Sequence, residues 1–123
     1  MNPRKILYVQ TSSVDTPERT YAPFILGATA VAMGMEASIF FGIKGVTIVQ
    51  KGEAEKVSLA NPFGSLAAAI EQAGKAGVSF FVCEESARML GVDLKEGLID
   101  GARVVGAATL NSMVLESDAV MYF

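Results

Sequence analysis

Short apolar runs alternate along the chain with longer stretches in which apolar residues recur every three or four positions. The runs have the length and the β-branched or aromatic content of buried strands, and they cover residues 5–10, 37–41, 78–83, 104–105 and 119–123. Strands that alternate with helices predict right-handed crossovers and a parallel sheet with both faces covered. The pattern therefore predicts an α/β domain with a five-stranded, mostly parallel sheet and helices on both faces.

The first helix is predicted to begin at Thr16, which offers an N-cap hydroxyl ahead of Pro17 and Glu18, and to end at Gly34. Its apolar positions predict one face packed on the sheet and comprise Tyr21, Phe24, Ile25, Ala28, Val31, Ala32 and Met35. Pro23 conflicts with this pattern, because a proline inside a helix costs about 3 kcal/mol. We therefore expect a kinked or irregular first turn.

Three further helices follow from their capping residues. Ser65 is predicted to cap a helix that Gly77 ends, and a helix over residues 84–90 should stop at the glycine that follows it. Thr109 is the expected N-cap of a last helix that runs to about Glu116.

Two segments have less regular patterns. Residues 42–49 begin as a turn and fit either a short helix or an extended segment. Residues 51–63 combine charged positions with the turn signals Asn61–Pro62 and, just beyond, Gly64, so this stretch is predicted to be a mobile loop.

The chain has 123 residues, of which 51% are hydrophobic and 19% are charged. This size and composition suffice for one buried core without disulfides or metal, so we expect a single domain over residues 1–123. The mean hydropathy of +0.41 is high for so small a domain. Part of the apolar surface is therefore expected to be covered by other subunits of a homo-oligomer.

The charge pattern excludes several classes of partner. The formal net charge is −3 and no run of Lys and Arg occurs, which argues against nucleic acid as a main partner. The first apolar run is too short for a signal peptide or a membrane span. One cysteine cannot form an internal disulfide, so we expect a cytoplasmic protein.

The absence of histidine excludes Ser-His-Asp and Cys-His catalytic arrangements and histidine-ligated metal sites. Acidic residues that could otherwise bind metal lack ligand spacing and fit solvated surface charge, and they are Asp93, Glu96, Asp100, Glu116 and Asp118. No metal and no cofactor are predicted.

Cys83 is the strongest candidate for chemistry because it ends an apolar strand and precedes a predicted helix at Glu84. Functional groups gather at the carboxyl ends of parallel strands, and the N–H groups of a helix start stabilise a thiolate. The carboxylates of Glu84 and Glu85 act in the opposite direction. The alternative is a packed core residue, because free cysteines are among the most buried side chains.

Further candidates for the pocket lie at other strand ends. Thr11 and Ser12 offer hydroxyls and backbone N–H groups after the first strand, and Lys44 lies between two glycines after the second. Asn111, in the last helix, is a further candidate. Each of these positions also fits an ordinary polar loop or surface turn. No glycine follows the first strand closely, which disfavours an FMN phosphate loop of the flavodoxin-like kind.

Several segments of the chain together resemble the DsrE/DsrF-like family of small sulfur-relay proteins. They are Ala32–Phe41, Gly45–Val46, the stretch Val82–Val92 around the cysteine, and Gly106–Ala107 after the fourth strand. The resemblance covers nearly the whole chain and implies a five-stranded parallel sheet and assembly into trimers or hexamers. It also implies that Cys83 accepts sulfane sulfur as a persulfide and passes it to a partner protein, as its sulfur-relay members do.

The leading hypothesis is a sulfur carrier or sulfurtransferase-type protein with its persulfide on Cys83. One cysteine suffices for this role, because the receiving thiol belongs to the partner. The second hypothesis is a homo-oligomeric protein that binds a small anion or nucleotide and in which Cys83 is structural. The third is a structural oligomer without a ligand. A trimer or larger ring is expected to bury residues 119–123.

Overall fold

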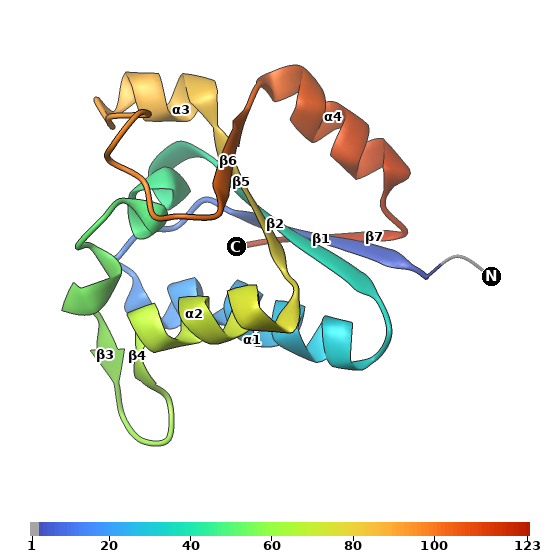
Figure 1. The fold of residues 1–123 in the computed structure, drawn as a ribbon, viewed down its shortest axis with the longest axis horizontal. Helices are drawn as coiled ribbons and strands as arrows, with labels where there is room; N and C mark the ends of the chain where they lie inside the picture. The colour runs from blue at the N-terminus through green and yellow to red at the C-terminus, as the bar shows by residue number, and fades with distance from the viewer. Residues whose placement is uncertain (1–2) are drawn as a thin grey trace.

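The computed structural model describes residues 3–123 and contains a five-stranded parallel sheet (Figure 1). Its strands are β1 (Lys5–Gln10), β2 (Glu36–Phe41), β5 (Ser79–Cys83), β6 (Ala102–Val105) and β7 (Ala119–Tyr122). They lie in the order β6-β5-β2-β1-β7, and each neighbouring pair is parallel. The predicted α/β fold and all five predicted strands are confirmed.

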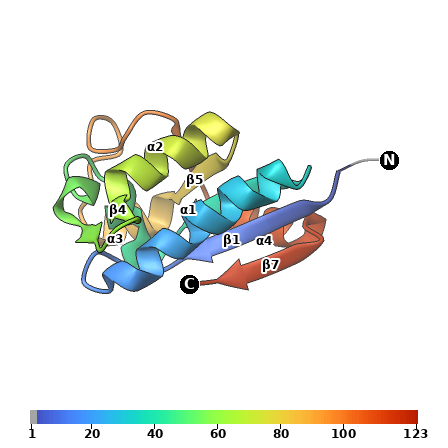
Figure 2. The ribbon, with the colours of Figure 1, turned by 90° about the horizontal axis from the view of Figure 1, so that it is seen from below.

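Helices cover both faces of this sheet, as predicted. Helices α1 (Pro17–Ala32) and α2 (Leu66–Ala76) lie side by side over one face, and α4 (Ala107–Glu116) lies over the other (Figures 1 and 2). Helix α3 (Glu84–Met89) continues directly from β5 and packs against the 3₁₀ helix η1 (Ile43–Val49) at the carboxyl end of the strands.

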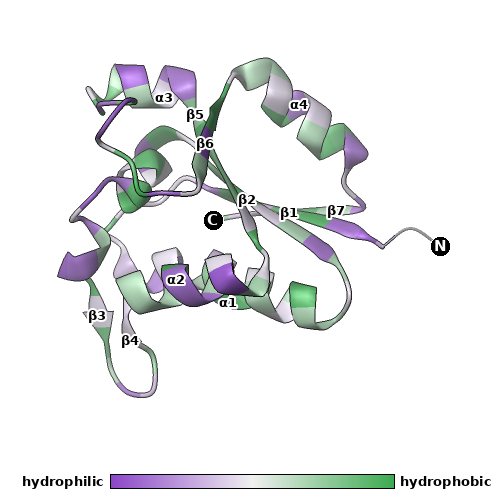
Figure 3. Ribbon diagram, in the orientation of Figure 1, coloured by the Kyte–Doolittle hydropathy of each residue, from purple (hydrophilic) through white to green (hydrophobic). Residues whose placement is uncertain are grey.

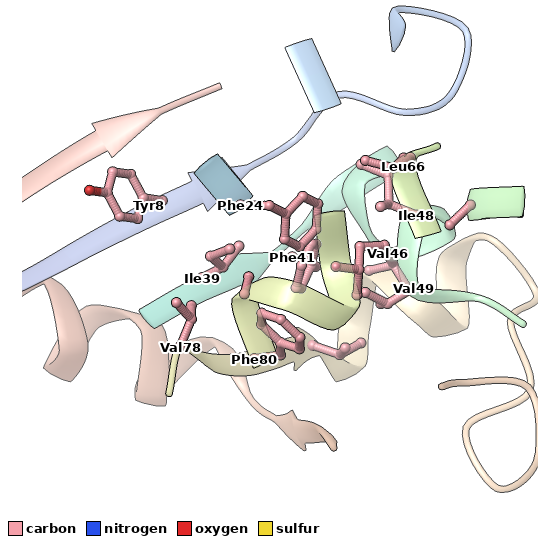
Figure 4. Close-up of a cluster of buried hydrophobic side chains, with 14 of the residues drawn as sticks. Tyr8, Phe24, Ile39, Phe41, Val46, Ile48, Val49, Leu66, Val78 and Phe80 are labelled. Carbon is pink, nitrogen blue, oxygen red and sulfur yellow. The ribbon is translucent and has the colours of Figure 1, made fainter. Parts of the chain in front are cut away.

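The main core lies between the sheet and the α1–α2 layer (Figure 4). Its centre is a group of three aromatic rings from α1, β2 and β5, in which the Phe24, Phe41 and Phe80 centroids are 5.8 to 5.9 Å apart. Burying a side chain of this size contributes about 2 kcal/mol to stability. These three rings pack α1, β2 and β5 against one another.

Helix α1 differs in three ways from its sequence pattern. It begins where predicted, but the Thr16 side chain makes no capping hydrogen bond, and the helix runs unbroken through Pro23 without the expected irregular turn. Tyr21 and Phe24 are buried as predicted. Ile25 is 43% exposed and Ala32 is exposed as well, because a smaller face packs inward, where Gly27 lies close to the Val78 side chain.

The other helix boundaries agree with prediction except at one cap. The Ser65 hydroxyl accepts a hydrogen bond from the Ala68 N–H at 3.2 Å, and Gly77 ends α2 in a left-handed conformation with φ +110°. The prediction that Thr109 caps the last helix is wrong. Helix α4 starts at Ala107 with Gly106 as its N-cap, which places Thr109 inside the first turn.

The segment between η1 and α2 contains short regular elements. They are the 3₁₀ helix η2 (Ala54–Lys56) and the antiparallel pair β3 (Ser58–Leu59) and β4 (Gly64–Ser65). The Tyr21 hydroxyl donates a hydrogen bond to the Gly64 carbonyl and ties this pair to α1. The predicted mobility of residues 51–63 stays a prediction.

None of the helices within residues 3–123 has the length and apolar character needed to cross a membrane.

Candidate functional site

Cys83 lies at the junction of β5 and α3, as its sequence position predicted. It is the last residue of the strand and also the N-cap of the helix, and its Sγ accepts a hydrogen bond from the Ser86 N–H at 3.4 Å. The residue is 9% exposed. The sulfur is therefore buried and contacts a backbone donor of the kind that stabilises an anion.

Glu85 brings a carboxylate to the same sulfur. Its Oε1 lies 3.6 Å from the Cys83 Sγ, and its Oε2 accepts a hydrogen bond from the Ala107 N–H at 3.4 Å. Its own backbone N–H and then the Ala107 N–H hold the pKa of the Glu85 carboxyl below its ordinary value. The carboxylate thus stays ionised near neutral pH while it bridges the cysteine and the first turn of α4.

Ser86 connects the cysteine to η1. Its backbone N–H donates to the Cys83 Sγ, and its Oγ accepts a hydrogen bond from the Ile43 N–H at 2.8 Å. Ile43 has φ +52°, although it is β-branched, and its side chain is 58% exposed. Such a conformation is strained for this residue type, and strained residues cluster at functional sites.

An apolar cluster surrounds the other side of the cysteine. Cys83 packs with Leu7, Val9 and Phe40, which form a small core beneath α4. The charged groups near the sulfur come from α3 instead, whose hydrophilic residues contrast with the apolar strands in Figure 3. Cys83 is therefore buried among apolar side chains and also contacts polar groups of α3.

Thr11 and Ser12 lie at the end of β1, which β2 separates from β5. The Thr11 backbone N–H and hydroxyl both donate to the Phe123 carbonyl, at 2.7 and 2.8 Å. The Ser12 hydroxyl accepts a hydrogen bond from the Arg19 Nε at 3.0 Å. These two residues hold the C-terminal strand and α1, and neither makes a hydrogen bond with Cys83.

The other three predicted pocket residues lie on η1, α3 and α4, and each one is paired with another side chain or exposed to solvent. Lys44 pairs with Asp15 at 3.4 Å, and Glu84 pairs with Arg88 at 2.9 Å. Asn111 is exposed on α4. The structure joins Glu85, Ser86 and Ala107 to the cysteine instead.

Some of the groups that contact Cys83 could be predicted from the sequence. With Cys83 as N-cap, Ser86 stands at the third helical position, whose N–H an N-cap side chain usually accepts. The sequence also predicted that the carboxylates after the cysteine would act on its sulfur. The contact between Glu85 and Ala107 spans 22 positions, so no local pattern could have predicted it.

A hollow lies away from the cysteine, between α2 and the segment before β6. Its volume is about 420 Å³, with Ile70 and Phe80 among its apolar lining residues and with Glu55, Glu71 and Asp100 among its charged ones. Within residues 3–123, no group of three or more His, Cys, Asp or Glu side chains is arranged to hold a metal ion.

The model of one protein family, described as the DsrE/DsrF-like family, matches residues 4–123. The uncharacterized protein MJ0760 of Methanocaldococcus jannaschii is 29% identical over 106 residues, which are 85% of this chain and 38% of that protein. The chain thus spans well under half the length of this relative.

Two solved structures share the fold. The ychN protein from E. coli superimposes with a TM-score of 0.79 at 18% identity and covers 98% of this chain and 99% of its own. MTH1491 from Methanobacterium thermoautotrophicum, a protein of unknown function, gives a TM-score of 0.66 at 15% identity over 99% of this chain and 100% of its own. At these identities the likeness establishes the parallel α/β fold.

Proposed function

Because the chain belongs to the DsrE/DsrF-like family, which suggests a role in sulfur relay, we propose that it is a sulfur carrier or sulfurtransferase-type protein. It takes sulfane sulfur on Cys83 as a persulfide and passes it to a partner protein. The observation that carries the proposal is the position of the Cys83 Sγ at a strand end, where the Ser86 N–H donates to it at 3.4 Å.

The loading step needs only thiol chemistry. The Cys83 Sγ attacks the outer sulfur of a donor persulfide, R–S–SH, and a new S–S bond forms as the donor's own S–S bond breaks. The leaving R–S⁻ takes up the proton that Cys83 loses, so the products are the Cys83 persulfide and R–SH. Transfer to an acceptor thiol repeats this exchange in the opposite sense, and neither step requires histidine or a second cysteine.

The test is mass spectrometry of the intact protein after exposure to a small-molecule persulfide. Wild type should gain roughly 32 Da, one sulfur atom, and Cys83→Ser should gain nothing. The added mass should also disappear when an acceptor thiol is supplied. A wild-type protein that takes up no sulfur while folded, yet reacts once it is unfolded, would show that Cys83 is structural.

The alternative is a binding protein, and the hollow beside α2 favours it. Its volume of about 420 Å³ falls in the range of small-molecule sites. Its lining carries three carboxylates and one ammonium group, that of Lys75, and this excess of negative charge disfavours an anion or nucleotide as its ligand. Nucleotide binding that a substitution of the lining residue Glu71 alters would favour this alternative over the sulfur carrier.

We also propose that the protein assembles into a homo-oligomer, a trimer or hexamer, in the cytoplasm. Helix α4 covers one sheet face, yet none of its residues is buried, and apolar side chains stand exposed on α4 and the edge strand β7. A second copy of the chain would cover this surface. The lone thiol supports a reducing compartment.

A further inference from the structure

The Cys83 sulfur has two contacts that act in opposite directions. The Ser86 N–H, 3.4 Å away, favours a negative charge on sulfur. The Glu85 Oε1, 3.6 Å away, disfavours that charge and accepts a hydrogen bond from the protonated thiol. Because both contacts are direct, loss of the carboxylate would leave the sulfur with the backbone donor alone.

Glu85 is held in that place by a segment far along the chain. Its Oε2 accepts a hydrogen bond from the Ala107 N–H at 3.4 Å. Gly106 lies beside the same oxygen, since a side-chain Cβ at that position would be 3.9 Å from it. Glu84, one residue earlier, is drawn away by its pair with Arg88 at 2.9 Å. Two neighbouring acids of equal charge therefore have different surroundings, and only one of them contacts the sulfur.

Other charged side chains lie on the elements around the cysteine. They are Glu84 and Arg88 on α3, Lys44 on η1, Arg103 on β6, Glu116 at the far end of α4, and Lys5 and Glu36 at the far ends of β1 and β2. Lys44 pairs with Asp15, and the Arg103 guanidinium lies over the Phe81 ring, 5.8 Å from its centroid. In the part of the chain that the structure describes, Glu85 is the charged side chain that hydrogen-bonds to Sγ.

We propose that Glu85 is a positioning residue that accepts the hydrogen bond of the Cys83 thiol, opposes negative charge on Sγ and thereby slows the uptake of sulfur. The inference rests on the proposed sulfur-carrier function. In the loading step the sulfur must lose its proton before or as the new S–S bond forms, and the nearby carboxylate opposes the negative charge that this creates. The carboxylate therefore protects the resting cysteine and slows its loading.

The experiment compares Glu85→Gln with Glu84→Gln, which makes the same change in net charge one residue away. The rate of Cys83 alkylation is followed from pH 6 to 10 in the folded proteins. In Glu85→Gln the profile should move toward lower pH, and the rate at pH 7 should rise about tenfold. In Glu84→Gln both should stay close to wild type.

Glu85→Ala separates charge from access. It should also move the midpoint downward, whereas a side chain that merely shields the sulfur would raise the rate equally at all pH values and leave the midpoint unchanged. Thermal melting of each variant checks that it is folded. Equal shifts in the Glu84 and Glu85 variants, or no shift in the Glu85 variants, would overturn the proposal.

The sulfur-carrier function is tested separately by persulfide uptake. At pH 7 the initial rate of the gain of roughly 32 Da should rise in Glu85→Gln by about the same factor as alkylation. If wild type and variant take up no sulfur but the alkylation profile shifts, the proposed function fails while the role of Glu85 in thiol protonation stands. If uptake occurs and neither profile nor rate changes, only the role of Glu85 fails.

Discussion

Gln10 is a polar side chain with no exposed surface, and its contacts explain how α1 accommodates a proline. Pro23 has no N–H, so the Arg19 carbonyl, four residues earlier, lacks its helical partner. The Gln10 Nε2 donates to that carbonyl at 3.2 Å, and its Oε1 accepts from the Ser12 N–H at 2.9 Å. The Gln10 side chain therefore supplies the hydrogen bond that the Arg19 carbonyl loses to Pro23, where the sequence predicted a kink.

Gln10→Leu should destabilise the protein by about 2 kcal/mol, because it leaves two backbone groups without partners. In a Pro23→Ala background, where position 23 regains an N–H for the Arg19 carbonyl, the same change should cost about 1 kcal/mol less. Urea unfolding of the four proteins gives this coupling energy. Additive effects would show that Gln10 does not compensate for the proline.

Ile43 holds its strained conformation beside the cysteine through the Ser86 hydroxyl. Asparagine tolerates positive φ far better, so Ile43→Asn should stabilise the protein by about 1 kcal/mol in thermal or urea unfolding. Ile25→Asn is the matched control, because Ile25 is also exposed but lies in regular helix. A gain in the control as large as that at Ile43 would exclude strain as the cause.

At the scale of elements, capping residues predicted two of three helix starts and one of three capping hydrogen bonds. Thr16, Ser65 and Thr109 all have the residue type of an N-cap, yet only Ser65 makes the capping hydrogen bond. The Thr16 hydroxyl lies 3.4 Å from the Asp15 carboxylate instead. Residue type and position suggest a cap, but the side chain's other possible partners decide whether it forms.

Ser65→Ala should therefore lower the free energy of unfolding by about 1 kcal/mol. Thr16→Ala and Thr109→Ala should change it by less than about 0.5 kcal/mol, since neither hydroxyl caps a helix. Urea unfolding of the three variants checks this order. A loss at Thr109 as large as that at Ser65 would contradict the observed start of α4 at Ala107.

At the scale of the whole molecule, the two faces of the sheet are covered unequally. The α1–α2 layer encloses the main core, whereas α4 lies alone over a smaller cluster and has no buried residue. Leu115 on α4 is 85% exposed, and Met121 and Tyr122 on the edge strand β7 are exposed as well. This unequal covering supports the oligomer inferred from the high mean hydropathy.

Leu115→Glu should shift the proposed oligomer toward monomer without loss of fold, because the side chain contributes little to the monomer's core. Ser112→Glu places the same charge one helical turn earlier at another exposed position and serves as control. Light scattering at micromolar concentration gives the mass of each protein. A wild-type protein that is monomeric under these conditions would contradict the proposed assembly.

The sequence by itself determined the elements and the place of the cysteine. Strand identity depends on short apolar runs and helix ends on local glycines and caps, so the sheet and the position of Cys83 at the end of β5 could be predicted. Only the tertiary structure decided which groups meet there. The partners of Gln10, Ile43 and Glu85 lie 9, 43 and 22 positions away, and packing of distant segments selects such contacts. For that reason Glu85, rather than Glu84, contacts the sulfur.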